Sequence, residues 1–108
     1  RTAIIPLSRK DLDFFEHKTG DTEGIVNYPL SIKNINLSIM LTERDDLVRL
    51  SFRSKGKFPA NKIARDFFEG GGHMNAAGGN SYVSIEETIE KIISLLPLFQ
   101  EQLDFVIS

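Results

Sequence analysis

A run of three glycines leads directly into a histidine in the stretch FFEGGGHMNAAGG, residues 67–79. Glycine adopts positive φ angles easily, and without a side chain it lets a ligand approach the backbone closely. Between the end of one helix and the start of another, such a loop would expose consecutive backbone N–H groups, which bind anions such as phosphate. The candidate phosphate-binding residues of this stretch are Gly70, Gly71, Gly72 and His73.

The residues around the histidine fit the same interpretation. The His73 imidazole can donate a hydrogen bond to a phosphate oxygen. The small residues that follow would keep the surface beneath a ligand low: Ala76, Ala77, Gly78 and Gly79. The alternative is that the glycines only cap the preceding helix and form a turn, with His73 on the surface. Residue spacing alone leaves both interpretations open.

A basic cluster, RSKG, is the second candidate site. Arg53 offers a planar fork of donors, Ser54 a hydroxyl group and Lys55 a compact positive charge, a combination suited to a phosphate or a nucleotide. The alternative is that these basic side chains are simply solvated, as is common at strand ends. One predicted helix joins the cluster to the glycine run. If the chain turns back after this helix, the strand end and the glycine run would lie together at one edge of the domain.

Alternation of apolar and polar residues predicts the strands that carry these groups. The alternation runs over 35–41 and again over 48–53, with the polar turn ERDD between them, which predicts an antiparallel hairpin. Residues 2–7, closed by Pro6, predict a strand near the edge of a sheet. Residues 82–83 predict a last short strand.

Helical periodicity predicts the remaining elements. Apolar residues recur at helical spacing over 60–68, where the glycines end the helix, and HMNAA would begin a further short helix. The capping box SIEE, which starts at Ser84, predicts a helix that Pro97 ends or bends. A helix is also predicted over 8–20, followed by a loop over 21–34 with one irregular helical turn.

These elements predict an α/β fold, a small mixed sheet with a central antiparallel hairpin and helices packed on it. At 108 residues the chain is one domain by length, and the lack of cysteine excludes disulfides, zinc–thiolate sites and thiol nucleophiles. The net charge of −2 gives no overall attraction to nucleic acid or anionic lipid, and no apolar run approaches the roughly 20 residues of a membrane span. We therefore expect a cytoplasmic protein with no membrane partner and no metal site in this chain.

The stretch GGGHMNAAG resembles the G-G-G-H-x-x-A-A-G motif of the DHH-associated domain, the carboxy-terminal partner of the catalytic domain in DHH-family phosphoesterases. The segments DTEGIVNYPLSI and RSKG resemble the oligoribonuclease branch (nanoRNase and pAp phosphatase), so the resemblance covers nearly the whole chain. Met74 and Asn75 depart from the pattern, since family members often carry a basic residue just after the histidine. The chain begins with Arg1 rather than methionine, which suggests a fragment of a longer protein, and the resemblance implies a catalytic DHH domain upstream.

The resemblance implies a parent enzyme that hydrolyses phosphodiester or phosphomonoester bonds in short oligoribonucleotides or in 3'-phosphoadenosine 5'-phosphate (pAp). Two manganese ions in the upstream domain would activate water and stabilise charge on the phosphoryl group. Residues 1–108 would form the substrate-binding domain, with no catalytic residue or cofactor. Arg53, Ser54 and Lys55, together with the glycine–histidine motif, would bind the nucleotide and set its scissile phosphate against the metals across an interdomain cleft.

Other functions remain open. Related domains of RecJ-type exonucleases and alanyl-tRNA synthetases would make the chain a binding module for single-stranded nucleic acid. A cyclic dinucleotide, or polyphosphate in an exopolyphosphatase-related protein, is an alternative substrate. A purely structural or dimerising domain is the non-catalytic alternative, and a homodimer is compatible with the sequence.

Overall fold

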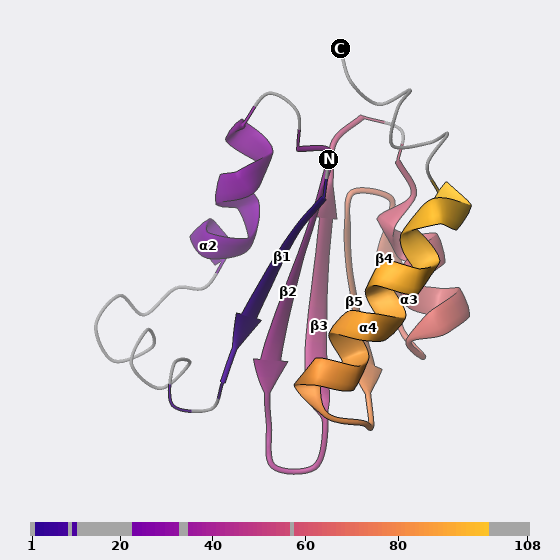
Figure 1. Ribbon diagram of the computed structural model, residues 1–108. Coiled ribbons are helices and arrows are strands. Elements are labelled where there is room, and N and C mark those ends of the chain that lie inside the picture. The colour runs from indigo at the N-terminus through magenta and orange to yellow at the C-terminus, as the bar shows by residue number, and fades with distance from the viewer. Residues whose placement is uncertain (1, 9, 11–22, 33–34, 57, 100–108) are drawn as a thin grey trace.

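The computed structural model describes residues 2–8, 10, 23–32, 35–56 and 58–99 (Figure 1). Its centre is a five-stranded sheet in the order β1-β2-β3-β5-β4, in which only β1 and β2 run parallel. The strands are β1 (Thr2–Leu7), β2 (Leu37–Glu43), β3 (Val48–Ser54), β4 (Gly71–His73) and β5 (Ala76–Ser81). The predicted α/β fold, with a mixed sheet and a central antiparallel hairpin, is therefore confirmed.

The hairpin of β2 and β3 forms the middle of the sheet. Ile39 lies opposite Phe52 and Leu41 opposite Leu50, and all four side chains are buried. All residues of β2 are buried except the last, whereas the residues of β3 that alternate with its buried positions are exposed or half-buried: Arg49, Ser51 and Arg53. One face of β3 therefore lies in the core and the other lies toward solvent.

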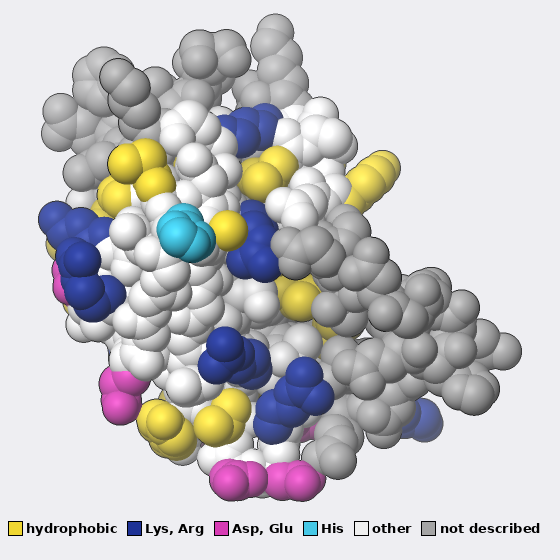
Figure 2. Space-filling view, turned by 180° about the vertical axis from the view of Figure 1, so that it is seen from behind, with side chains coloured by type: hydrophobic (Ala, Val, Ile, Leu, Met, Phe, Trp, Pro, Cys, Tyr) yellow, Lys and Arg dark blue, Asp and Glu magenta, His cyan; other side chains and the backbone are white. Residues whose placement is uncertain are grey.

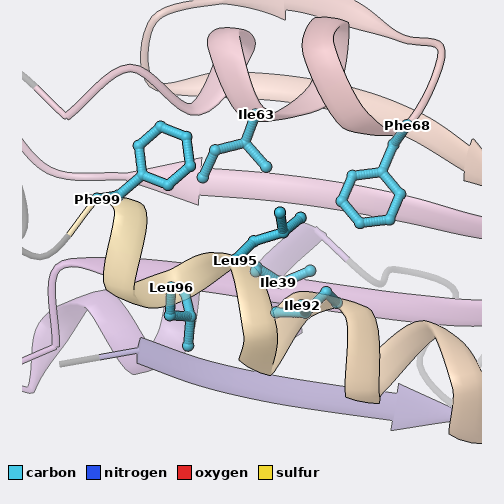
Figure 3. A pocket seen from close by; sticks show the side chains of 7 residues that line it. All are labelled: Ile39, Ile63, Phe68, Ile92, Leu95, Leu96 and Phe99. Carbon is cyan, nitrogen blue, oxygen red and sulfur yellow. The ribbon is translucent and has the colours of Figure 1, made fainter.

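The inner face of the sheet is covered by α3 (Ala60–Phe67) and α4 (Ile85–Leu95) (Figure 1). Side chains from these helices and from the 3-10 helix η2 (Leu96–Phe99) converge over Ile39 of β2, as Figure 3 shows. The rings of Phe52 and Phe68 lie 5.6 Å apart between centroids in the same core. Full burial of such a side chain contributes about 1.5–3 kcal/mol, which holds the helices on the sheet.

The opposite, outer face is covered by described elements mainly over β1 and β2. There α2 (Glu23–Asn27) and the 3-10 helix η1 (Tyr28–Ser31) follow one another, and Val26 packs in a small cluster with Leu7 and Met40. These elements confirm the helical turn predicted within 21–34. The helix α2 lies near β3 as well as β2, whereas over β5 and β4 the outer face carries no described helix.

The helix boundaries follow the predicted signals. Ser84 Oγ accepts a hydrogen bond from the Glu87 N–H at 3.1 Å, which confirms the capping box. Pro97 lies in η2, directly after the end of α4. The glycine run ends α3, as predicted, because the Gly70 N–H donates to Ala64 O at 2.9 Å and closes the last turn.

Two predictions for the segment after the glycines are wrong. HMNAA does not begin a helix, because Met74 and Asn75 form a turn and strand β5 follows it. Residues 82–83 form a bend, and the strand occupies the residues just before them. Small residues have low strand propensity, so pairing with β3 and β4 is what keeps β5 extended. The helix predicted over 8–20 falls mainly outside the described residues.

The close approach of β4 to β5 makes a matched pair of substitutions informative. A Cβ atom at Gly70 would collide with the carbonyl oxygen of Gly78, whereas a Cβ atom at Gly71 would meet nothing within 4 Å. We expect Gly70→Ala to lower the free energy of unfolding by about 1–3 kcal/mol through overpacking. We expect Gly71→Ala to leave it unchanged or to raise it by up to about 1 kcal/mol. Urea denaturation measures both, and equal losses would contradict this packing.

Candidate phosphate-binding groove

The outer face carries polar side chains of β3 beside the small residues of β5 and β4. Cross-strand neighbours point to the same side of a sheet, so the pairing register defines rows of residues across these three strands. The histidine row is Arg53, Ala76 and His73, and the glycine row is Ser51, Gly78 and Gly71.

A groove of about 230 Å³ lies along these rows, and His73 and Gly70 are not among the residues that line it. Five of the predicted site residues line it: Arg53, Gly71, Gly72, Ala76 and Ala77. Figure 2 looks onto this face, where Lys and Arg side chains gather around the histidine and the white strip of exposed backbone. The structure thus brings the end of β3 and the glycine run to one rim, while their function stays a prediction.

Arg53 and His73 stand at opposite ends of the histidine row, with only the methyl group of Ala76 between them. Adjacent strands are about 4.8 Å apart, so the Cα atoms of the two residues are separated by about 10 Å. Arg53 Nη1 donates to Phe52 O at 3.0 Å and to Ala77 O at 3.4 Å, which holds the guanidinium at the groove. His73 is exposed. A phosphate placed above Ala76 is therefore within reach of both side chains.

The backbone of the glycine run differs from the prediction, because it forms the edge strand β4 and not a loop. Alternate residues of an antiparallel strand direct their backbone groups to opposite sides. Asn75 O accepts a hydrogen bond from the Ser54 N–H of β3. The next residue, Ala76, therefore directs its backbone N–H and C=O groups to β4, where its partner is His73. Gly72, the next residue along β4, therefore turns its N–H to the open edge. The prediction of consecutive exposed backbone N–H groups is therefore wrong. Within the described strand β4, Gly72 supplies a single exposed N–H group.

Ser54 and Lys55 have contacts within the protein. The buried Ser54 hydroxyl lies 2.8 Å from Phe58 O and 3.2 Å from Met74 O, and it accepts from Asn75 Nδ2 at 3.0 Å. Lys55 Nζ donates to the carbonyl oxygen of residue 32 at 3.0 Å. Neither side chain lines the groove. Of the RSK cluster, Arg53 alone lines the groove. Ser54 points to the opposite face because successive residues of a strand alternate, and Lys55 lies beyond the end of β3.

Sequence reasoning missed two lining residues of the groove, Arg49 and Ser51. The alternation of β3 was a usable signal for both, because residues two and four positions before Arg53 share its face. Gly78, which the sequence analysis placed beneath a ligand, also lines the groove. Its place there depends on the pairing of β5 with β3 and β4.

The chemistry of the groove is that of cationic side chains and an edge N–H group, which suits an anionic ligand. Among the described residues, no three His, Asp or Glu side chains are grouped so that they could hold a metal ion. Within the same part of the chain, every helix is too short or too polar to cross a membrane.

Comparison with known proteins identifies the family. Residues 12–101 match the DHHA1 domain, and the chain belongs to this family, which confirms the family resemblance inferred from the sequence. An exopolyphosphatase-related protein from Bacteroides fragilis is 42% identical, with a TM-score of 0.86 over 95% of this chain. The chain spans 30% of the length of that protein.

Two more distant structures share the fold. The C-Ala domain of alanyl-tRNA synthetase from Aquifex aeolicus has a TM-score of 0.62 at 11% identity, over 88% of this chain and 89% of that one. An uncharacterized protein from Helicobacter pylori has a TM-score of 0.54 at 20% identity, over 78% of this chain and 30% of that one. No curated protein matches the sequence. At 11% and 20% identity, the similarity to these two structures concerns the fold alone.

Two buried serines of the hairpin form a matched pair for testing the role of Ser54. Ser38, the cross-strand neighbour of Arg53, is buried, and its Oγ has no hydrogen-bond partner among the described residues. Ser54→Ala is expected to lower the free energy of unfolding by about 1–3 kcal/mol, because it leaves buried partners unsatisfied. Ser38→Ala should change it by less than about 0.5 kcal/mol or raise it. Chemical denaturation measures both, and a larger loss for Ser38→Ala would refute this assignment.

Proposed function

We propose that this chain is the substrate-binding domain of a DHH-family phosphoesterase and that its groove holds nucleotide phosphates. The observation that carries the proposal is the histidine row, in which Arg53 and His73 flank Ala76. Hydrogen bonds from a guanidinium or a protonated imidazole to phosphoryl oxygens are charge-assisted and therefore strong. The DHHA1 family and the exopolyphosphatase-related relative support this class of parent enzyme.

The part of this chain in the reaction would be to bind and orient the substrate. Arg53 and His73 would fix one phosphate above Ala76, so that the bond to be cleaved is presented to catalytic groups of another domain. Such positioning lowers the entropic part of the reaction barrier. The described residues offer no ligand set for the two manganese ions, so the proposal assigns the metals and the hydrolysis to an upstream DHH domain. The chain by itself would cleave nothing.

Short oligoribonucleotides and pAp fit the groove better than a long single strand does. A volume of about 230 Å³ suits a small ligand. Sites for long single strands carry aromatic side chains on which bases stack. The exposed tyrosines of the described residues, Tyr28 and Tyr82, do not line the groove. The net charge of −2 also supplies no broad attraction to a long polyanion.

Substitutions in the histidine row test this site. Arg53→Gln and His73→Ala are each expected to raise the Kd for adenosine 5'-monophosphate (AMP) about tenfold or more, because a charge-assisted hydrogen bond contributes about 1.5–3 kcal/mol. Lys62→Gln removes an exposed charge on α3 and is the matched control. It should leave the Kd within about twofold, since solvent and salt screen a distant charge. Calorimetric titration measures each Kd, and circular dichroism checks folding.

The same titrations separate the competing functions. An equal loss of affinity in all three variants would contradict a specific site at the histidine row. A long single-stranded RNA that binds far more tightly than a dinucleotide would favour the nucleic-acid binding module. If Arg53→Gln and His73→Ala leave the activity of the full-length protein unchanged, the structural or dimerising role is favoured instead.

A further inference from the structure

A second arginine lies in the groove at the end away from the histidine row. Arg49 precedes Arg53 by four residues on β3, so both side chains project from the outer face, and both line the groove. At a rise of about 3.4 Å per residue, their Cα atoms are about 13 Å apart along the strand. Ser51 lies midway between them and lines the groove as well. The cationic groups of the groove therefore occur at two separate places along β3.

The Arg49 side chain is held on the sheet by specific contacts. Its Nη1 donates to Asn80 Oδ1 of β5 at 3.1 Å. Its Nη2 lies 3.3 Å from the position that a Cβ atom on Gly78 would occupy, so the guanidinium rests beside the bare backbone of that glycine. The Asn80 side chain is a neutral amide and not a carboxylate, and this contact therefore orients Arg49 without cancelling its positive charge.

The glycine row, to which the Arg49 guanidinium reaches, has a floor that is almost bare. Ser51 is followed across the sheet by Gly78 and Gly71, which have no side chains. A Cβ atom on Gly71 would meet nothing within 4 Å, so packing inside the protein does not require a glycine at this position. Because the Arg49 guanidinium rests beside Gly78, it lies one row from Ala76, and residues two apart on a strand are separated by about 7 Å. A sugar that carries two phosphates could therefore span from the histidine row to Arg49.

We propose that Arg49, oriented by Asn80, forms a second anion subsite, and that the groove prefers ligands with two phosphate groups separated by a sugar. This inference rests on the proposed function, which places the first phosphate at Arg53 and His73. The ligand class is then a nucleoside bisphosphate or a dinucleotide lying along β3. A ligand with one phosphate would use the histidine row and leave Arg49 unoccupied.

Paired titrations with AMP and pAp test the second subsite, because these ligands differ by one phosphate group. Arg49→Gln is expected to raise the Kd for pAp about tenfold and to leave the Kd for AMP within about twofold. Arg49→Lys should retain part of the affinity for pAp, since it keeps the charge but loses the planar fork. Asn80→Ala should weaken pAp selectively by releasing the guanidinium. Lys62→Gln is again the control for charge alone.

The outcomes distinguish this inference from the function on which it rests. If Arg53→Gln weakens both ligands while Arg49→Gln weakens neither, or weakens both equally, the second subsite is wrong and the proposed function stands. If the wild-type protein binds neither ligand, or if Arg53→Gln changes neither Kd, the proposed function fails and the second subsite fails with it. A selective loss of pAp affinity in both Arg49→Gln and Asn80→Ala supports the subsite.

Discussion

The tight packing around β5 is the constraint on which the outer face depends. A Cβ atom on Gly79 would lie 2.7 Å from Phe68 Cβ, so the strand can pass this close to the end of α3 only with glycine at that position. Phe68 in turn packs against Phe52 in the inner core. On the outer side the same strand presents only small side chains, from Ala76 to Gly78. The close contacts inside fix the position of β5, and the small outer side chains leave room for the shallow groove above it.

The neighbouring strand, β3, contributes to the core with one face and to the groove with the other. Its buried residues, Leu50 and Phe52 among them, face the helices, and the residues between them carry the charges of the groove. Because side chains alternate with a period of two, a shift of one residue would expose the core and bury both arginines. The apolar face thus fixes where the cationic face points, without any contact between them.

The parts of the fold that were predictable from the sequence are those with a local signal. The alternation of β2 and β3, the helical spacing of α3 and the capping box at Ser84 each identify their element without knowledge of the rest of the chain. The segment from Gly71 to Ser81 was misassigned because its small residues have neither period, and only pairing with β3 makes them a strand. Arg53 was predicted with Ser54, although strand parity buries Ser54. Applying the same parity to Arg49 and Ser51 would have found them.

An amide-resolved NMR titration with AMP tests the central claim most directly, because it locates the ligand without any substitution. The account predicts that the largest shifts fall on the backbone amides of Gly71, Gly72 and His73 and on Arg53 Nε, with the amides of α4 unchanged. Shifts confined to α4 and α3, with the β4 and β5 amides unmoved at saturation, would contradict it.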